Sequence, residues 1–374
     1  MTDFLARVMP GIRDLRPYEP GKPTAELERE LGISDIVKLA SNENALGPSP
    51  LAVAAMREAL EDVALYPDGN GYELKRALAA KHSVGMDQIT LTSGSDHVFE
   101  LVCRVFLGPD RRAVMSRYGF AIFAIAARAA SADLVIAEAY ASDDAAMPFG
   151  HDAAALLAAT GAADTHVVYI ANPNNPTGTH IGQRALEELV ESLPTDTIVV
   201  VDEAYHEYLD GSDAPDASTL LAAHDNLVVM RTFSKAYGLA GVRVGYALAS
   251  VQVTDLLNRV RLAFNPNQLA QVAAVAALDD AEHLQATRDA NRAGMAQMRT
   301  GLDALGLRYM PSVCNFLTVD VGRPGPEVFQ ALLREGVIVR PLIPYGLAQW
   351  LRISIGTEAQ NLRCLAALAK VLGR

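Results

Sequence analysis

The sequence has few cysteines, and their spacing excludes two common ways of stabilising a fold. Only three occur in 374 residues, and none belongs to a Cys-x-x-Cys pair. They are Cys103, Cys314 and Cys364. We therefore expect neither a disulfide framework nor a structural zinc site, and we interpret the three as core or incidental thiols.

Positive charge and long apolar runs are also scarce. Acidic residues outnumber basic ones by 44 to 32, for a formal net charge of −12, which disfavours binding to nucleic acid or to an anionic membrane. Residues 1–16 lack the apolar centre of a signal peptide, and no later run is long enough to span a bilayer. We expect a cytoplasmic protein in which any small anionic ligand binds a local group of cations.

The middle of the chain alternates short, branched apolar runs with longer helical patterns. This alternation is typical of a mostly parallel sheet covered by helices, and continuously hydrophobic runs indicate strands buried on both faces. We therefore predict an α/β fold with a seven-stranded sheet. The predicted strands are Ile89–Thr92, Ala113–Ser116, Asp133–Ala137, His166–Ile170, Thr197–Val201, Leu227–Thr232 and Gly245–Leu248.

The composition of the two ends predicts a smaller unit beside this sheet. We expect an N-terminal arm, 1–40, that packs with a small α+β domain, 266–374, and a large domain, 41–265, between them. The predicted helices outside the sheet are Thr24–Leu31, one that begins at Leu51, Gln268–Leu305, and a closing helix that begins at about Thr357. The predicted strands outside the sheet are Asn315–Val321, Val337–Arg340 and Trp350–Ile355.

Polar residues follow the predicted strands directly. Ligands of open α/β sheets bind at the carboxyl ends of strands, so these residues are the candidates for a site. They are Ser93–Asp96, Tyr118, Asn172–Gly178, Asp202–Tyr205 and Ser234–Lys235.

Lys235 is the residue on which the functional prediction depends. A pyridoxal phosphate enzyme needs a lysine for the aldimine, a carboxylate for the pyridine nitrogen, donors for the phenolate oxygen and cations for the phosphate. A lone lysine is usually a solvated surface residue. Lys235, however, follows an apolar run and precedes the glycine-containing turn 236–241, so a partly enclosed amine of lowered pKa is expected. Arg243, eight residues later, offers a fork for a phosphate.

The other cofactor roles have candidates upstream, each with a simpler alternative. Asp202 ends an apolar run and could hold the pyridinium proton, or could simply cap a turn. Tyr205 and Asn175 could donate to the phenolate oxygen, or be a half-buried tyrosine and a turn residue. Ser93–Asp96 opens a helix whose N–H groups could cradle a phosphate, although a simple helix cap explains it nearly as well.

This series resembles the fold type I pyridoxal phosphate aminotransferases along essentially the whole chain. More narrowly, four segments resemble the histidinol-phosphate aminotransferases. These segments are Arg16–Pro23, Lys38–Asn44, Tyr66–Asp68 and Leu351–Gly356.

The resemblance implies a homodimer that binds pyridoxal 5'-phosphate in active sites at the subunit interface. Lys235 would be the aldimine lysine and proton shuttle, Asp202 the pyridinium partner, and Tyr205 and Asn175 the phenolate partners. Tyr118 would stack on the ring. The implied phosphate neighbours are Ser95, Asp96, Thr232, Ser234 and Arg243, with Tyr66 from the other subunit, and the implied substrate contacts are Tyr18, Asn44, Arg340 and Arg352.

Three positions depart from the family pattern and bear on the choice of amino donor. His97 follows Asp96 where glutamate is more frequent, Ser116-Arg117 replaces a proline, and Pro341–Tyr345 is an apolar segment that could line a pocket for a ring. The resemblance implies transamination of L-histidinol phosphate with 2-oxoglutarate, in histidine biosynthesis. The alternatives are an aromatic amino acid aminotransferase, a phospho-amino-acid decarboxylase and a non-catalytic module that only binds the cofactor.

Overall fold

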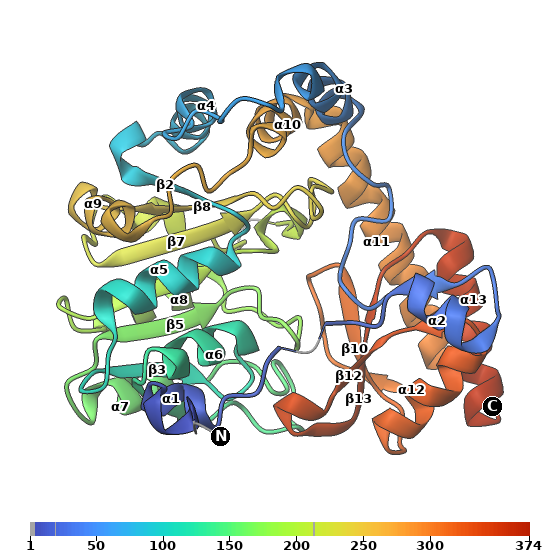
Figure 1. Ribbon diagram of the computed structural model, residues 1–374. Coiled ribbons are helices and arrows are strands. Elements are labelled where there is room, and N and C mark those ends of the chain that lie inside the picture. The colour runs from blue at the N-terminus through green and yellow to red at the C-terminus, as the bar shows by residue number, and fades with distance from the viewer. Residues whose placement is uncertain (1–3, 19, 212–213) are drawn as a thin grey trace.

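The computed structural model describes residues 4–18, 20–211 and 214–374. In this part of the chain the strands form a seven-stranded, a four-stranded and a two-stranded sheet. Figure 1 shows the large sheet and its helices on one side of the molecule and the four-stranded sheet, with its own helices, on the other. None of the helices among the described residues combines the length and the apolar character needed to cross a bilayer.

The large sheet confirms the predicted α/β fold. Its strand order is β2-β8-β7-β6-β5-β3-β4, and only β8 runs against its neighbours among the described strands. The prediction placed each strand within one residue of its observed ends. The strands are β2 (Ile89–Thr92), β3 (Arg112–Ser116), β4 (Asp133–Ala137), β5 (Val167–Ala171), β6 (Ile198–Asp202), β7 (Leu227–Thr232) and β8 (Gly245–Ala249).

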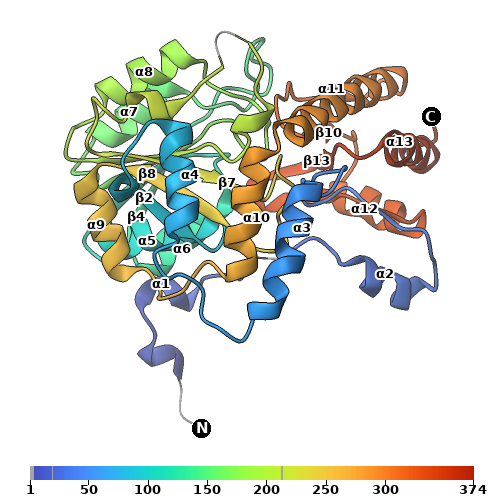
Figure 2. The same ribbon diagram turned by 90° about the horizontal axis from the view of Figure 1, so that it is seen from above.

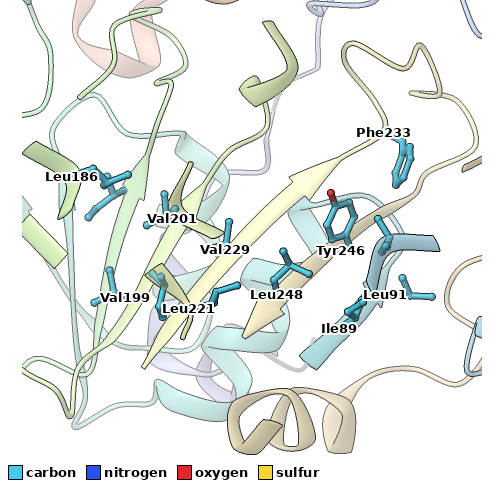
Figure 3. Close-up of a cluster of buried hydrophobic side chains, with 14 of the residues drawn as sticks. Ile89, Leu91, Leu186, Val199, Val201, Leu221, Val229, Phe233, Tyr246 and Leu248 are labelled. Carbon is cyan, nitrogen blue, oxygen red and sulfur yellow. The ribbon is translucent and has the colours of Figure 1, made fainter. Parts of the chain in front are cut away.

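Alternating side chains of these strands enter two separate apolar cores. Val199, Val201 and Val229 point to one face, which we call the α8 face, and Val200 and Val228 point to the other, the α5 face. Figure 3 shows the first of these clusters. The α8 face is covered by α3 (Pro50–Ala59), α4 (Tyr72–His82), α7 (Ala153–Gly161), α8 (Gln183–Ser192) and α10 (Gln268–Asp279), and the α5 face by α5 (Asp96–Phe106), α6 (Ala121–Ala129) and α9 (Val251–Val260).

The four-stranded sheet is antiparallel and has a core of its own. Its order is β12-β13-β10-β9, and the separate parallel pair β1–β11 lies beside it. The predicted strand Val337–Arg340 is in fact two strands. The elements are β1 (Val37–Lys38), β9 (Arg308–Tyr309), β10 (Phe316–Asp320), β11 (Val337–Ile338), β12 (Arg340–Leu342), β13 (Leu347–Ser354), α11 (Ala281–Ala304), α12 (Gly325–Arg334) and α13 (Glu358–Leu372).

The predicted helix Gln268–Leu305 is broken at Asp280. This residue leaves the helical conformation and its carboxylate accepts a hydrogen bond from His283 N at 3.0 Å, which caps α11. Before the break, the buried alanines of α10 pack into the core of the α8 face, against α3. Packing partners therefore change near Asp280 rather than at residue 265, and we propose the division between large and small domain there.

The N-terminal arm does not pack with the small sheet alone. Its helix α1 (Pro10–Arg13) lies on α6, where Gly11 N donates to Ser131 Oγ at 3.0 Å. The later part of the arm does pack with the small domain, α2 (Thr24–Leu31) through Leu27 and β1 through Val37. The expectation that the whole arm packs with the small domain is therefore wrong for residues 10–13.

Short 3-10 segments complete the described structure, and the three cysteines are buried free thiols. The 3-10 segments are η1 (Phe4–Arg7), η2 (Leu60–Asp62), η3 (Met86–Gln88), η4 (His206–Tyr208), η5 (Ala217–Leu220) and η6 (Ile343–Tyr345).

Helix α13 offers a matched test of core packing. Leu368 is 0% exposed in the small-domain core, whereas Leu362 on the same helix is 54% exposed. Leu368→Ala should lower the free energy of unfolding by about 2 to 5 kcal/mol, because it leaves a cavity. Leu362→Ala should change it by less than about 0.5 kcal/mol. Urea denaturation followed by circular dichroism measures both, and equal losses would contradict the packing described here.

Candidate active site

A cavity of about 210 Å³ lies on the α5 face where β5, β6 and β7 end. The last residue of each strand, Ala171, Asp202 and Thr232, lines it. The structure thus brings most of the predicted site residues together at the expected edge of the sheet. Those that line the cavity are Tyr18, Ser95, Asp96, Asn175, Asp202, Tyr205, Thr232, Ser234, Lys235 and Arg243.

Lys235 lies just beyond the end of β7, half-buried in this cavity. Its Nζ donates a hydrogen bond to Ser41 O at 3.1 Å and lies 5.8 Å from the centre of the Tyr205 ring. Burial lowers the pKa of Lys235 to about 8, with help from the positive charges of Arg352 and Arg243. Its neutral, nucleophilic form is therefore far more abundant near neutral pH than that of a solvated lysine.

Asp202 presents a buried carboxylate to the same cavity. Its Oδ2 accepts a hydrogen bond from the Tyr169 hydroxyl at 3.0 Å, and its Oδ1 accepts one from Ala204 N at 3.1 Å. Burial raises the pKa of Asp202 to about 6, although both hydrogen bonds oppose the shift. The turn interpretation is therefore correct for Oδ1, yet the carboxylate also faces the cavity and can hold a proton of a ligand.

Tyr205 is held by a residue that the sequence interpretation overlooked. Its hydroxyl oxygen accepts a hydrogen bond from Asn42 Nδ2 at 2.7 Å, and burial raises the pKa of Tyr205. Asn42 N in turn donates to Ser354 Oγ at 2.8 Å. The sequence did contain a signal that could have identified Asn42, because this residue lies in the segment 38–44 on which the resemblance partly rests.

Arg352 connects the small sheet to the cavity. Its Nη1 donates to Asn175 Oδ1 at 2.5 Å and its Nη2 to Ala40 O at 2.7 Å, while its buried Nε has no partner among the described residues. The Asn175 oxygen is thus occupied, and its amide nitrogen remains able to donate. The guanidinium also lies 5.4 Å from the centre of the Phe316 ring.

An anion cradle lies at the start of α5. Arg243 Nη2 is 2.6 Å from Asp96 Oδ1, and a Cβ at Gly94, whose φ is +82°, would be 2.1 Å from Arg243 Nη2. Ser95 makes no side-chain capping bond to the described helix, so the simple cap interpretation is wrong for its hydroxyl. The N–H groups at this helix start, the fork of Arg243 and the hydroxyls of Ser95 and Ser234 suit a phosphate.

Tyr118 does not line the cavity. It packs edge-on against Phe149, with 5.3 Å between ring centres, in an apolar cluster beside β12 and β13. Phe120, two residues later, lines the cavity instead. The prediction of Tyr118 as the stacking ring is not supported by its position, because its side chain is used in packing.

Asn44, a predicted substrate contact, is absent from the cavity lining, and its amide makes hydrogen bonds within the chain. Its Nδ2 donates to Ala236 O at 2.9 Å and to Thr287 Oγ1 at 3.0 Å, and its Oδ1 accepts from Leu46 N at 2.9 Å. These bonds occupy the amide away from the cavity and hold the residue after Lys235.

Two further predicted residues, Arg340 and Tyr66, do not line the cavity. The Arg340 guanidinium lies 5.3 Å from the centre of the Tyr18 ring, and Arg340 pairs in register with Arg352 across β12 and β13. Tyr66 is 82% exposed and stacks on Phe264 at 4.6 Å, outside the cavity of its own chain.

The departures from the family pattern also lie outside the cavity. His97 is half-buried on α5, and burial lowers its pKa. In the segment Pro341–Tyr345, the Tyr345 hydroxyl accepts a hydrogen bond from Ala121 N at 3.2 Å, and the Tyr345 ring joins the cluster around Tyr118. The expectation that this segment lines a pocket for a ring is not supported by the cavity in the described structure.

Comparison with known proteins identifies the family. The family model described as aminotransferase class I and II matches residues 34–368. The chain belongs to this family. Within it, the chain is 52% identical to histidinol-phosphate aminotransferase 2 of Pseudomonas aeruginosa, covering 100% of this chain and 99% of that protein. It is 51% identical to histidinol-phosphate aminotransferase 2 of Methylococcus capsulatus, covering 97% and 98%.

Solved structures show the same fold. The histidinol-phosphate aminotransferase of Sinorhizobium meliloti, determined in complex with pyridoxal-5'-phosphate, matches with a TM-score of 0.88 and 29% identity over 98% of each chain. The Thermus thermophilus aspartate aminotransferase with maleate matches with a TM-score of 0.82 at 23% identity, over 97% and 99% of the two chains, and supports the fold alone. The large sheet therefore has the fold type I arrangement that the sequence predicted.

The lowered pKa of Lys235 gives a pH-dependent prediction for this aminotransferase. Because the neutral amine is the reactive form, the rate of pyridoxal phosphate uptake by cofactor-free protein should rise with pH and reach half its maximum near pH 8. A solvated lysine would shift that midpoint to about 10.4. Stopped-flow absorbance across pH 6 to about 11 measures it, with free N-acetyl-lysine as the control. A rate that keeps rising above pH 10 would contradict the desolvated site.

Proposed function

We propose that this aminotransferase transfers the amino group of L-histidinol phosphate to 2-oxoglutarate, in histidine biosynthesis, with pyridoxal 5'-phosphate as its cofactor. The observation that carries the donor is the 52% identity over the whole chain to relatives named for that substrate. The cavity supports the chemistry, because one amine of lowered pKa and one buried carboxylate face it together.

The residues of the chain have distinct roles in this proposal. When bound, pyridoxal phosphate supplies an aldehyde that takes up the amino group and a ring that withdraws electrons from the substrate carbon. Asp202 holds the proton on the ring nitrogen, because a carboxylate nearby favours the charged ring. Tyr205 Oη and Asn175 Nδ2 donate to the phenolate oxygen, and Lys235 Nζ carries the proton between carbons.

The phosphate of the cofactor fits the cradle at the start of α5. Arg243 supplies a guanidinium, and Ser95 and Asp96 at the start of α5 line the same cavity. Asp96 holds the Arg243 fork by its 2.6 Å ion pair, which limits the rotamers the guanidinium can adopt. Ser95, Thr232 and Ser234 provide neighbouring hydroxyls.

Two arginines and a tyrosine are the proposed substrate contacts. The buried Nε of Arg352 has no partner in the described part of the chain, which costs free energy until an anion or another acceptor is bound. The Arg340 guanidinium lies over the ring of Tyr18, which lines the cavity. L-histidinol phosphate brings a phosphate and no carboxylate, while 2-oxoglutarate brings carboxylates, and a guanidinium binds either anion through two hydrogen bonds.

We further propose a cytoplasmic homodimer in which Tyr66 enters the site of the other subunit. The loop that carries Tyr66 lies beside the segment between α9 and α10 (Figure 2). Val63, Leu65 and Leu262 are each more than 60% exposed on these two segments. Apolar side chains gathered in this way are typical of an interface.

A comparison of amino donors tests the substrate. With 2-oxoglutarate as the acceptor, kcat/KM for L-histidinol phosphate should exceed that for L-phenylalanine by more than about a hundredfold, or about 2.7 kcal/mol of transition-state binding. A ratio near one would favour an aromatic amino acid aminotransferase. Release of carbon dioxide in place of a keto product would favour a decarboxylase, and cofactor binding without turnover would favour a binding module.

Asp202→Asn tests the proposed acid. The amide cannot hold the ring proton as a carboxylate does, so kcat should fall by about a hundredfold, which corresponds to two pKa units or about 2.7 kcal/mol. Some cofactor should remain bound, because the phosphate cradle is unchanged. Asp133→Asn, at the start of exposed strand β4, is the control and should keep the parental rate. Near-parental turnover of Asp202→Asn would show that another group holds the proton.

A further inference from the structure

A buried ion pair lies on the α8 face of the large sheet, behind the cavity. Arg231 is 2% exposed and Glu203 is 0% exposed. The Arg231 Nε and Nη2 both donate to Glu203 Oε2, at 2.9 and 2.7 Å. Neither residue lines the cavity, and the proposed reaction uses neither.

The pair is held by further hydrogen bonds from the segment before η5. Arg231 Nη2 also lies 2.7 Å from Asp216 Oδ1, and Ala217 N donates to Glu203 Oε1 at 2.7 Å. Asp216 N donates to Gln183 Oε1 on α8, again at 2.7 Å. The guanidinium is therefore fixed at two points by carboxylates that are themselves anchored.

Strand geometry couples this pair to the cavity. Successive residues of a strand point to opposite faces, so Glu203 and Arg231 face α8 while their chain neighbours Asp202 and Thr232 face the cavity. Glu203 N donates to Met230 O at 2.9 Å. The ion pair thus ties β6 to β7 one residue from the point where each strand presents a cavity residue.

A metal ion is a poor alternative occupant of this cluster. Ligand atoms of Glu203, His206 and Asp216 lie within 4.8 Å of one another, the one such group among the described residues. The Arg231 guanidinium already bonds to both carboxylates and puts its positive charge where a cation would lie. The acidic side chains therefore have their counter-ion within the chain.

Burying such a pair is an inefficient way to gain stability. The desolvation of two charges offsets most of their attraction, and apolar residues of similar volume often stabilise a core as well or better. What two N–H bonds from one guanidinium to one carboxylate oxygen add is a fixed distance and orientation between two strands. Its location next to Asp202 and four residues before Lys235 makes that fixed geometry relevant to the site.

We propose that the Arg231–Glu203 pair is a positioning element that holds the ends of β6 and β7 so that Asp202 and Lys235 meet the cofactor together. The inference rests on the proposed binding of pyridoxal phosphate. It adds two residues on the far face of the sheet that act through their neighbours and touch neither cofactor nor substrate.

Arg231→Lys is the first test. Lysine keeps the charge but is a single point donor, so the two-point hold on Glu203 is lost. The Kd for pyridoxal phosphate, measured by fluorescence titration of cofactor-free protein, should rise about tenfold. At saturating cofactor kcat should fall about tenfold with little change in KM, since small displacements of reacting groups have large effects on rate.

Glu203→Gln is the second variant, in case lysine does not fold in place of Arg231. Glutamine keeps the shape of the side chain and one acceptor oxygen. The variant should therefore raise Kd and lower kcat, as Arg231→Lys does, but by a smaller factor. The pH midpoint of the absorbance change of the bound cofactor should also move in both variants. A purely structural role would lower the melting temperature and leave that midpoint unchanged.

Arg112→Lys is the matched control. Arg112 Nη2 lies 2.9 Å from Asp133 Oδ2, and this pair joins the first residues of β3 and β4 at the opposite edge of the same sheet. It should bind cofactor and turn over like the parent. Parental Kd, kcat and absorbance midpoint in folded Arg231→Lys and Glu203→Gln would overturn the positioning role alone. A parent that binds no pyridoxal phosphate would instead overturn the proposed function.

Discussion

The site depends on keeping two opposite charges out of water at one edge of a sheet. Burial lowers the pKa of Lys235 to about 8 and raises that of Asp202 to about 6, so each group is moved toward its neutral form. Between these two values both groups are mainly charged, yet each can exchange its proton at little cost in free energy. A solvated lysine and aspartate would be separated by more than six pKa units, about 10.4 against about 3.9.

This desolvation requires contributions from both parts of the molecule. Arg352 and Ser354 come from β13 of the small sheet, whereas Asn175 and Tyr205 follow strands of the large sheet. Arg352 bonds directly to Asn175, and Ser354 reaches Tyr205 through Asn42. These hydrogen bonds join the small sheet to two residues that line the cavity, Asn175 and Tyr205.

The sequence predicted the strands well because strands buried on both faces consist almost entirely of apolar residues. Leu227–Thr232 is buried at every position, and an uninterrupted branched run has few alternatives to a central strand. It predicted Lys235 and Asp202 for the same reason, since each comes at the end of such a run. Strand ends determine where a side chain emerges, and here that was sufficient to place Asp202 and Lys235 at one cavity.

The site residues that the cavity does not include lie where tertiary packing decides between neighbours. Tyr118 and Phe120 lie in one loop, and only the cluster around Phe149 determines which ring is used in packing and which faces the cavity. Asn42 and Asn44 differ in the same way, since one holds Tyr205 and the other holds Ala236. No local pattern separates two aromatic or two amide side chains that are two residues apart.

Arg340 and Arg352 are two like charges that the fold places opposite each other, which the sequence alone could not reveal. They are directly opposite each other in β12 and β13, and like charges at such positions destabilise a sheet. The structure separates them by giving Arg352 the oxygens of Asn175 and Ala40, and Arg340 the face of Tyr18. Two cations with different partners at one strand pair can meet two different anions, which is what a site serving a phosphate donor and a carboxylate acceptor in turn requires. The repulsion between them also diminishes whenever an anion is bound, so anion binding and the stability of this sheet should be coupled.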